Sequence, residues 1–283
     1  MPPGRKEREL REEFARSYQR AQSQTMLEIE RAVCGCDFGG TSWTTRSEAE
    51  EIGRLLALEP GKRLLEVGSG SGWPGLYFAQ TTGCDLALVD VPYEALRIAA
   101  RRAARDRLDN RCWIALADGA ALPFAPNSFD AISHSDVLCC LREKQSVLSA
   151  CKRVLRPGGR MVFTVISIAP DLSSADYERA IEFGPPFVEA SAPYTELLKR
   201  NGWVIEDYVD LTRGYAESVR RLLHAEDARI AELNDLLGED TVTERLASRR
   251  TNLRSIEEEL LRRELFAATA TATDDCGSES PQS

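Results

Sequence analysis

Residues 64–75, LLEVGSGSGWPG, place four glycines directly behind a short apolar run that contains the carboxylate of Glu66. Glycine lets a chain turn at positive φ and lets a ligand approach the backbone without meeting a Cβ atom. In open α/β sheets, ligands bind at the carboxyl ends of the strands. The stretch therefore predicts a strand at 63–67 that opens into a loop against a bound molecule.

Segments with strand and helix patterns alternate along the chain on both sides of this loop. The patterns predict further strands at 85–90, 112–117, 129–134 and 160–167, and helices at 47–58, 74–81, 93–107 and 143–155, the first of them capped by Ser47. Such alternation favours a parallel sheet with helices on both faces. The expected fold class is α/β, with a doubly wound sheet.

The two ends of the chain depart from this alternation. A charged amphipathic helix is expected at 6–33, a further helix at 194–201, and strands at 203–211 and 264–272. Between those two strands, apolar residues recur at helical spacing over 215–262 with a break at Gly238, which predicts two inserted helices. The chain is thus divided into an N-terminal helix and lid loop (1–46), a main domain (47–272) and a disordered tail (273–283).

Composition limits the classes of function. The chain has 283 residues, 43% of them apolar, and a net charge of −9, which weighs against nucleic acid and anionic membranes as partners. It has no apolar run long enough to span a membrane and no signal-peptide pattern, so we expect a soluble, cytoplasmic protein. The eight cysteines are expected to be reduced thiols, and with only two histidines no metal site is predicted.

The glycine spacing fits two kinds of ligand. Residues 70–75 satisfy GxGxxG, the dinucleotide fingerprint, but there the first glycine follows the strand at once, and here that position belongs to Gly68. The pattern at the strand end is Glu66-x-Gly68-x-Gly70-x-Gly72. A carboxylate at its entrance would repel a pyrophosphate and suit a cationic ligand, so a nicotinamide dehydrogenase is disfavoured.

Two aspartates follow the next expected strands. Asp90 ends the second strand and can accept hydrogen bonds from a ribose diol, or alternatively cap the helix after Pro92. Asp118 ends the third strand and can accept from an adenine amino group, with Gly119 and Ala120 beside it, or alternatively serve a plain turn. Both readings of each aspartate stay open.

Five segments together carry a resemblance to a known family. They are LLEVGSGSG (64–72), LVDVP (88–92), LADGAALPF (116–124), FDAISHSDVL (129–138) and LRPGGRMVF (155–163). In this order the chain resembles the class I S-adenosylmethionine-dependent methyltransferases, in particular those that act on small molecules. The resemblance implies a seven-stranded Rossmann-like sheet with an antiparallel last strand beside the fifth, and S-adenosylmethionine as the cofactor.

The resemblance also implies residue roles. The methionine part of the cofactor would lie against Glu66, Gly68, Ser69, Gly70 and Gly72; the ribose against Asp90 and Val91; the adenine against Asp118, Gly119 and Ala120; and the methyl group beside Ser133. A sulfonium methyl group is already activated, so transfer needs alignment of the acceptor and only sometimes a base. His134 and Asp136 are the candidate bases, although strand alternation can also point His134 into packing. The motifs are compatible with N, O, C or S as the nucleophile.

Segments outside the core motifs suggest covers for the site. Trp43 or Phe38, beside a Gly-Gly pair, could close over the cofactor. The helices at 215–262 could cover the acceptor, pack on the sheet edge or pair two subunits into a homodimer. An RNA methyltransferase, with the arginines of 97–111 as a basic face, and a non-catalytic S-adenosylmethionine-binding protein are the alternatives to a small-molecule methyltransferase.

Overall fold

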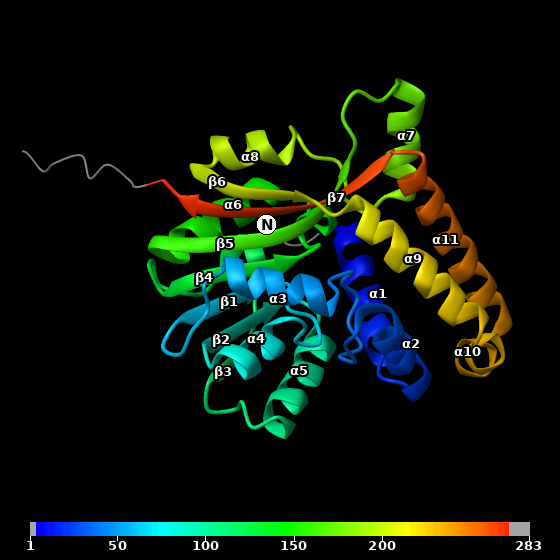
Figure 1. Ribbon diagram of the computed structural model, residues 1–283, viewed down its shortest axis with the longest axis horizontal. Coiled ribbons are helices and arrows are strands. Elements are labelled where there is room, and N and C mark those ends of the chain that lie inside the picture. The colour runs from blue at the N-terminus through cyan, green and yellow to red at the C-terminus, as the bar shows by residue number, and fades with distance from the viewer. Residues whose placement is uncertain (1–3, 272–283) are drawn as a thin grey trace, which may run out of the picture.

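A computed structural model describes residues 4–271 and shows one seven-stranded mixed sheet flanked by helices (Figure 1). The strand order is β3-β2-β1-β4-β5-β7-β6. The strands are β1 (Arg63–Val67), β2 (Asp85–Asp90), β3 (Cys112–Leu116), β4 (Phe129–Ser135), β5 (Leu155–Ile168), β6 (Trp203–Asp210) and β7 (Leu261–Ala270). Strands β1 to β5 pair in parallel, whereas β7 lies antiparallel between β5 and β6. The expected doubly wound α/β fold with an antiparallel last strand is confirmed.

Helices follow the strands as the alternation predicts, with additions at both ends. They are α1 (Arg5–Arg20), α2 (Gln24–Cys34), α3 (Arg46–Leu55), α4 (Gly75–Thr82), α5 (Tyr93–Arg105), α6 (Lys144–Val154), α7 (Ser174–Phe183), α8 (Tyr194–Arg200), α9 (Thr212–Asp227), α10 (Ile230–Leu237) and α11 (Glu239–Glu257). Figure 1 shows α9, α10 and α11 extending away from the sheet, with α1 and α2 lying between them and the sheet.

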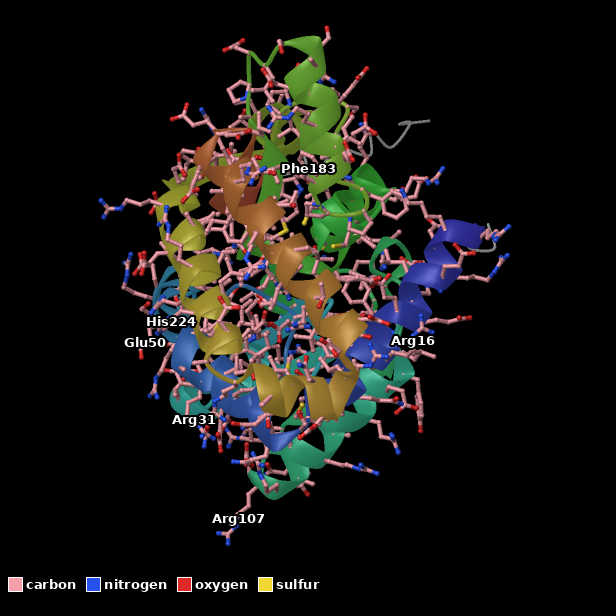
Figure 2. The ribbon with its side chains drawn as sticks, turned by 90° about the vertical axis from the view of Figure 1, so that its right-hand side faces the viewer. Arg16, Arg31, Glu50, Arg107, Phe183 and His224 are labelled. Carbon is pink, nitrogen blue, oxygen red and sulfur yellow. The ribbon has the colours of Figure 1, made fainter. Side chains whose placement is uncertain are left out.

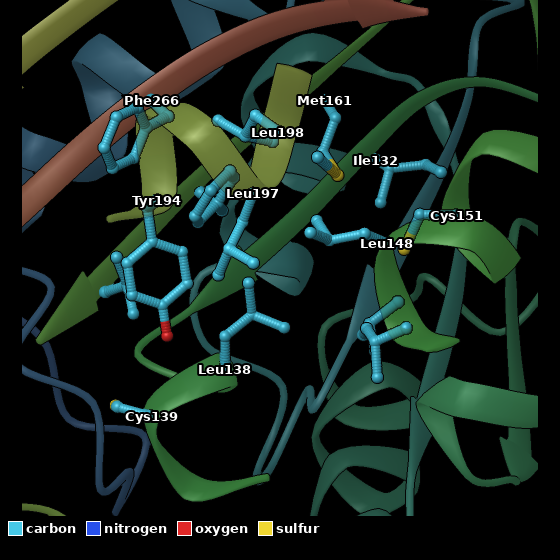
Figure 3. Packing of buried hydrophobic residues seen from close by; sticks show 14 of the residues in the cluster. Ile132, Leu138, Cys139, Leu148, Cys151, Met161, Tyr194, Leu197, Leu198 and Phe266 are labelled. Atoms are coloured by element: carbon cyan, nitrogen blue, oxygen red, sulfur yellow. The ribbon is translucent and has the colours of Figure 1, made fainter. Parts of the chain in front are cut away.

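Two apolar clusters on opposite faces hold the sheet. Side chains of α6 and α8 pack on one face with Leu65, Ile132 and Phe163. Side chains of α3, α4 and α5 pack on the other face with Leu64 and Ala131, the strand neighbours of the first set. Figure 3 shows part of the first cluster, where Tyr194, Leu197 and Leu198 of α8 meet the strands. Burial on both faces is what a parallel sheet requires, and it explains the nearly continuous apolar strands.

Four local expectations differ from the structure. The helix expected at 6–33 is two helices, because the chain breaks at Ala21–Gln22 and Ser23 caps α2. The cap of α3 is Thr45, which forms a reciprocal capping box with Glu48, and not Ser47. The insertion holds three helices, and α7 lies where no element was expected. These ends are set by side-chain hydrogen bonds that apolar periodicity does not report.

Other expectations concern the whole chain. No helix among residues 4–271 has both the length and the apolar character needed to cross a membrane. Seven cysteines in the described part are free thiols, and these residues contain no cluster suited to a metal ion. The tail predicted to be disordered, 273–283, lies outside the described residues.

Candidate active site

A cavity of about 270 Å³ opens at the carboxyl ends of the parallel strands. Its walls come from the loops after β1, β2, β3 and β4, from the end of β5, from residues 40–43 and from α1. Of the residues predicted to form the site, the cavity is lined by Gly68, Ser69, Gly70, Asp90, Val91, Asp118, Gly119, Ala120, Asp136 and Trp43. Residues separated by more than a hundred positions in sequence thus surround one space.

The glycine loop meets the cavity at Gly68 and Gly70. Both have left-handed backbones, with φ of 67° and 53°. A Cβ atom at Gly68 would lie 2.4 Å from Val137 Cγ2, and one at Gly70 would lie 2.5 Å from Tyr18 Oη. Gly72 does not line the cavity; a Cβ atom there would lie 2.5 Å from Leu76 Cδ1. The expected contact of Gly72 with the cofactor is therefore corrected to a role in packing α4 against the loop.

Glu66 lies beneath the loop instead of in the cavity. It is 1% exposed, and its Oε2 atom accepts a hydrogen bond of 2.8 Å from the backbone N–H of Gly75. Burial raises the pKa of Glu66 to about 8. The expectation that Glu66 faces the methionine part of the cofactor is corrected, because its side chain points away from the cavity and binds the first N–H group of α4.

Asp90 joins the glycine loop to the second strand. Its two carboxylate oxygens accept hydrogen bonds of 2.7 Å from the backbone N–H groups of Gly70 and Val91. Burial raises the pKa of Asp90 to about 6. A carboxylate offers about four lone-pair directions, so two remain for a ligand on the cavity side. Asp90 therefore shapes the loop and can still accept from a diol.

Asp118 and the short turn η1 (Gly119–Ala121) form the far wall. Asp118 Oδ1 accepts a hydrogen bond of 3.0 Å from the N–H of Ala120, and Oδ2 lies 3.3 Å from an Arg11 guanidinium nitrogen. Asp118 is therefore a turn residue that caps η1, and it also lines the cavity, where a ligand could contact it. Arg11 places a helix from the N-terminal segment directly across this wall.

Two expected residues on β4 lie in the core. His134 is 1% exposed, its ring stacks on Phe163 at 4.5 Å between centroids, and neither ring nitrogen has a partner among the described residues. Burial lowers the pKa of His134 to about 3. Ser133 is also 1% exposed and does not line the cavity, whereas Ser135, on the same side of the strand, does. Both expectations are corrected, since β4 extends to Ser135, one residue beyond the expected strand, and Ser133 and His134 lie buried within it.

Asp136 lines the cavity but is committed to an ion pair. Its carboxylate oxygens lie 3.0 Å and 3.2 Å from Nε of Arg263, a side chain of β7 that is 0% exposed. Arg263 also contacts Glu48 Oε1 at 2.9 Å, and these charges raise the pKa of Arg263. Both carboxylate oxygens are thus held by one guanidinium, so Asp136 acts here as an anchor.

Asp136 also binds the segment of residues 40–43 that lines the cavity. Asp136 Oδ2 accepts a hydrogen bond of 3.3 Å from the backbone N–H of Trp43, and the Trp43 ring packs edge-on against Tyr215 of α9 at 5.0 Å. Phe38 is not part of this cover; it packs on Trp73 at 5.0 Å between centroids. Of the two aromatic residues considered as a lid, only Trp43 reaches the cavity.

Helix α1 lines the cavity; an N-terminal helical lid was expected from the sequence, but not which of its residues would face the site. Its lining side chains are Glu7, Leu10, Arg11, Phe14 and Tyr18. Tyr18 lies over Gly70 and shares a hydrogen bond of 3.0 Å with the Thr41 hydroxyl. The helix was expected to be amphipathic, but the pattern does not say what its apolar side covers. The spacing of Leu10, Phe14 and Tyr18, four residues apart, is the signal that could have located this face.

The cavity is acidic. Five carboxylates line it (Glu7, Asp90, Asp118, Asp136 and Glu143) against two guanidinium groups, those of Arg11 and Arg142. The field of such a lining attracts a cation. A sulfonium with an ammonium group is therefore a better fit than a pyrophosphate, in agreement with the choice made from the glycine spacing.

Known proteins share the central part of this chain. Residues 65–163 match the model of a family described as a methyltransferase domain. The chain is 32% identical over 119 residues to the methyltransferase GfsG of Streptomyces halstedii, across 42% of this chain and 43% of that protein. It is 30% identical over 143 residues to the 27-O-demethylrifamycin SV methyltransferase of Amycolatopsis mediterranei, across 50% of this chain and 52% of that protein. The chain thus spans about half the length of these relatives.

Solved structures extend the likeness to nearly the whole fold. The phosphoethanolamine N-methyltransferase 2 of Haemonchus contortus, solved with S-adenosylhomocysteine, superimposes with a TM-score of 0.75 at 19% identity, over 92% of this chain and 60% of that chain. The [4+2]-cyclase SpnF superimposes with a TM-score of 0.71 at 20% identity, over 92% of this chain and 95% of that chain. Residues 65–163 are therefore a methyltransferase domain, in a chain with the fold of the class I S-adenosylmethionine-dependent methyltransferases.

Proposed function

We propose that this protein binds S-adenosylmethionine and transfers its methyl group to a small-molecule acceptor. The observation that carries the proposal is the convergence of Gly68, Gly70, Asp90 and Asp118 on one acidic cavity. The methyltransferase domain and its small-molecule relatives support the reaction class. We also propose a cytoplasmic location, which free thiols support.

The residues fit the cofactor in a specific way. Asp90 would accept from the ribose hydroxyls, and Asp118 from the adenine amino group. The backbones of Gly68 and Gly70 border the cavity, while Val137 and Tyr18 occupy the positions that Cβ atoms would take there. When bound, the cofactor supplies a methyl group that is already activated for displacement.

The chain would contribute alignment and exclusion of water. Among the described residues that line the cavity there is no histidine, and Asp136 is paired with Arg263. Positioning an acceptor in line with the methyl group is therefore the main requirement that these walls can meet. Helix α1 and Trp43 would close the site. This division of the chain into a cover (1–46) and a domain (47–272) is part of the proposal.

The alternatives are distinguishable. The arginines of α5 are largely engaged, since Arg97 pairs with Glu94 at 2.6 Å and Arg102 with Asp37 at 2.5 Å, which supports a small molecule over RNA. The fold is shared with a [4+2]-cyclase, so the fold alone does not establish methyl transfer, and a function without it stays an alternative. Helices α9 to α11 pack on one another, and α9 packs on α2, which supports a role as a cover within one subunit. A homodimer through 215–262 stays a prediction, which size-exclusion chromatography with light scattering can test.

Two measurements test the proposal in sequence. Calorimetry with S-adenosylmethionine, S-adenosylhomocysteine and NAD tests the cofactor, and binding of NAD alone would contradict it. Incubation with methyl-labelled S-adenosylmethionine and a metabolite extract, followed by mass spectrometry, tests transfer. Binding of the cofactor without any labelled product would favour the non-catalytic alternative.

A further inference from the structure

A second cavity, of about 500 Å³, lies behind the first. It is enclosed by α1, α2, residues 39–43 and the inserted helices α9, α10 and α11. Figure 2 views the molecule from the side on which α9 and α11 lie across this region, with Arg16 of α1 labelled at its edge. Phe14 and residues 40–43 line both cavities, so the two spaces share one wall.

The second cavity has the opposite charge. Four arginines line it (Arg16, Arg20, Arg245 and Arg249) against two carboxylates, those of Glu13 and Glu30. This is unusual in a chain with a net charge of −9. A basic space within an acidic protein attracts anions and repels the cation that suits the first cavity. The two cavities therefore select ligand groups of opposite sign.

The buried charges around this space already have partners, with one exception. Glu30 accepts hydrogen bonds of 2.6 Å and 3.1 Å from the N–H groups of Gly39 and Gly40. Arg245 forms an ion pair of 2.7 Å with Glu226, a residue that is 0% exposed. Each of these groups holds the wall of the cavity in place. Glu30 and Arg245 therefore have partners without a ligand, whereas Glu226 Oε2 is buried with no hydrogen-bond partner among residues 4–271.

Arg249 is the exception. Its Nε atom is buried without a hydrogen-bond partner, and no carboxylate within residues 4–271 forms an ion pair with this guanidinium. The guanidinium lies 5.3 Å from the ring centroid of Trp43, which belongs to the shared wall. Burial lowers the pKa of Arg249. Glu226 acts on Arg249 only from beyond ion-pair distance and is already paired with Arg245, so two guanidinium groups share one buried carboxylate. An anionic ligand would balance the second guanidinium.

The rest of the lining is largely apolar. It includes Phe14, Met26, Ile29, Val33, Leu222 and Leu237. Cavities of about 300–1,000 Å³ with apolar walls and a few polar groups are typical of small-molecule sites. The complement of this cavity is thus an apolar body that carries one anionic group.

We propose that the second cavity is the acceptor site and that the acceptor is an apolar small molecule with a carboxylate or phosphate group bound by Arg249. This inference rests on the proposed methyl transfer, because it assigns the partner of the cofactor. The anionic group would lie at Arg249, and the apolar body would pass Trp43 toward the first cavity. The charges favour the cationic cofactor in the first cavity and the anionic group of the acceptor in the second.

Four ten-carbon probes test the proposal by calorimetry on the full chain with S-adenosylhomocysteine present. Decanoate and decyl phosphate carry the anion, 1-decanol carries none, and decyltrimethylammonium carries a cation. We expect the wild type to bind at least one anionic probe more tightly than the other two. The stronger of decanoate and decyl phosphate identifies the anionic group. Equal binding of all four probes, or no binding of either anion, would overturn the proposal.

Matched variants locate the contact. Arg249→Met should weaken binding of the preferred anion about tenfold or more and leave 1-decanol unchanged, whereas Arg249→Lys should retain part of the affinity. The control is Arg250→Met, on the exposed side of the same helix, where Arg250 pairs with Asp227 at 3.4 Å. An equal loss in Arg250→Met would overturn the assignment. S-adenosylhomocysteine titrated into the same variants reports on the cofactor site, so failure of the acceptor site is distinguishable from failure of the proposed function.

Discussion

Replacement of Gly70 by alanine tests the packing of α1 on the glycine loop. The backbone of Gly70 is left-handed, with φ of 53°, which costs an alanine about 1–2 kcal/mol. The new Cβ atom would lie 2.5 Å from Tyr18 Oη and 2.9 Å from Tyr18 Cζ. Tyr18 must then move and lose its hydrogen bond of 3.0 Å to Thr41, a net loss of about 0.5–1.5 kcal/mol. We therefore expect Gly70→Ala to lower the free energy of unfolding by about 1.5–3.5 kcal/mol.

A matched glycine separates strain from contact. Gly158 is also left-handed, with φ of 75°, and a Cβ atom there would meet nothing within 4 Å. Gly158→Ala should therefore show only the conformational cost. Urea denaturation of both variants, of Tyr18→Leu and of the double variant Gly70→Ala/Tyr18→Leu gives the coupling between Gly70 and Tyr18. We expect a coupling of about 0.5–1.5 kcal/mol, against a scatter of about 0.3–0.5 kcal/mol for independent sites.

The same variants report on the ligand. The N–H of Gly70 donates to Asp90 Oδ2 at 2.7 Å, so a displaced loop also displaces the carboxylate proposed to bind ribose. Calorimetry should show a weaker affinity for S-adenosylhomocysteine in Gly70→Ala and none of this loss in Gly158→Ala. Additive effects of Gly70→Ala and Tyr18→Leu, with an unchanged affinity, would refute the reasoning that α1 and the ligand both approach the backbone at Gly70.

Three further outcomes are expected. Asp90→Ala should weaken cofactor binding by about 1.5–3 kcal/mol in calorimetry, the range for hydrogen bonds to a charged group, and a folded variant with full affinity would make Asp90 a loop anchor only. Burial raises the pKa of Glu66 to about 8 from its ordinary 4.5, so the folded state binds the proton more tightly and the free energy of unfolding should fall as pH rises from about 4.5 to 8. Urea titrations of Glu66→Gln should lack this pH-dependent fall. A fall of the same size in the variant would show that Glu66 is not its cause. His134→Phe should keep both cofactor affinity and turnover, with an equal or higher Tm, since it removes an unpartnered buried imidazole; lost turnover in a folded variant would restore His134 as the base.

The sequence by itself determined the order of the elements and the strand ends that line the cavity. Strands β1 to β5 lie close to the predicted segments because two-sided burial makes them continuously apolar. Gly68, Gly70, Asp90 and Asp118 were located because each follows such a strand at its carboxyl end, where a parallel sheet places its ligand. These features depend on neighbours within a few residues, which a single sequence displays.

Only the tertiary structure decided where individual side chains point and what they meet. Glu66 and His134 turned into the core because strand side chains alternate, and the alternation does not say which face opens on the cavity. Asp136 is held by Arg263, 127 positions away in the chain, and Arg249 of α11 reaches Trp43 of the N-terminal segment. Such pairings arise when the sheet brings β4 and β7 to one end and the insertion folds back over α1 and α2, because contacts between distant segments leave no local pattern in the sequence.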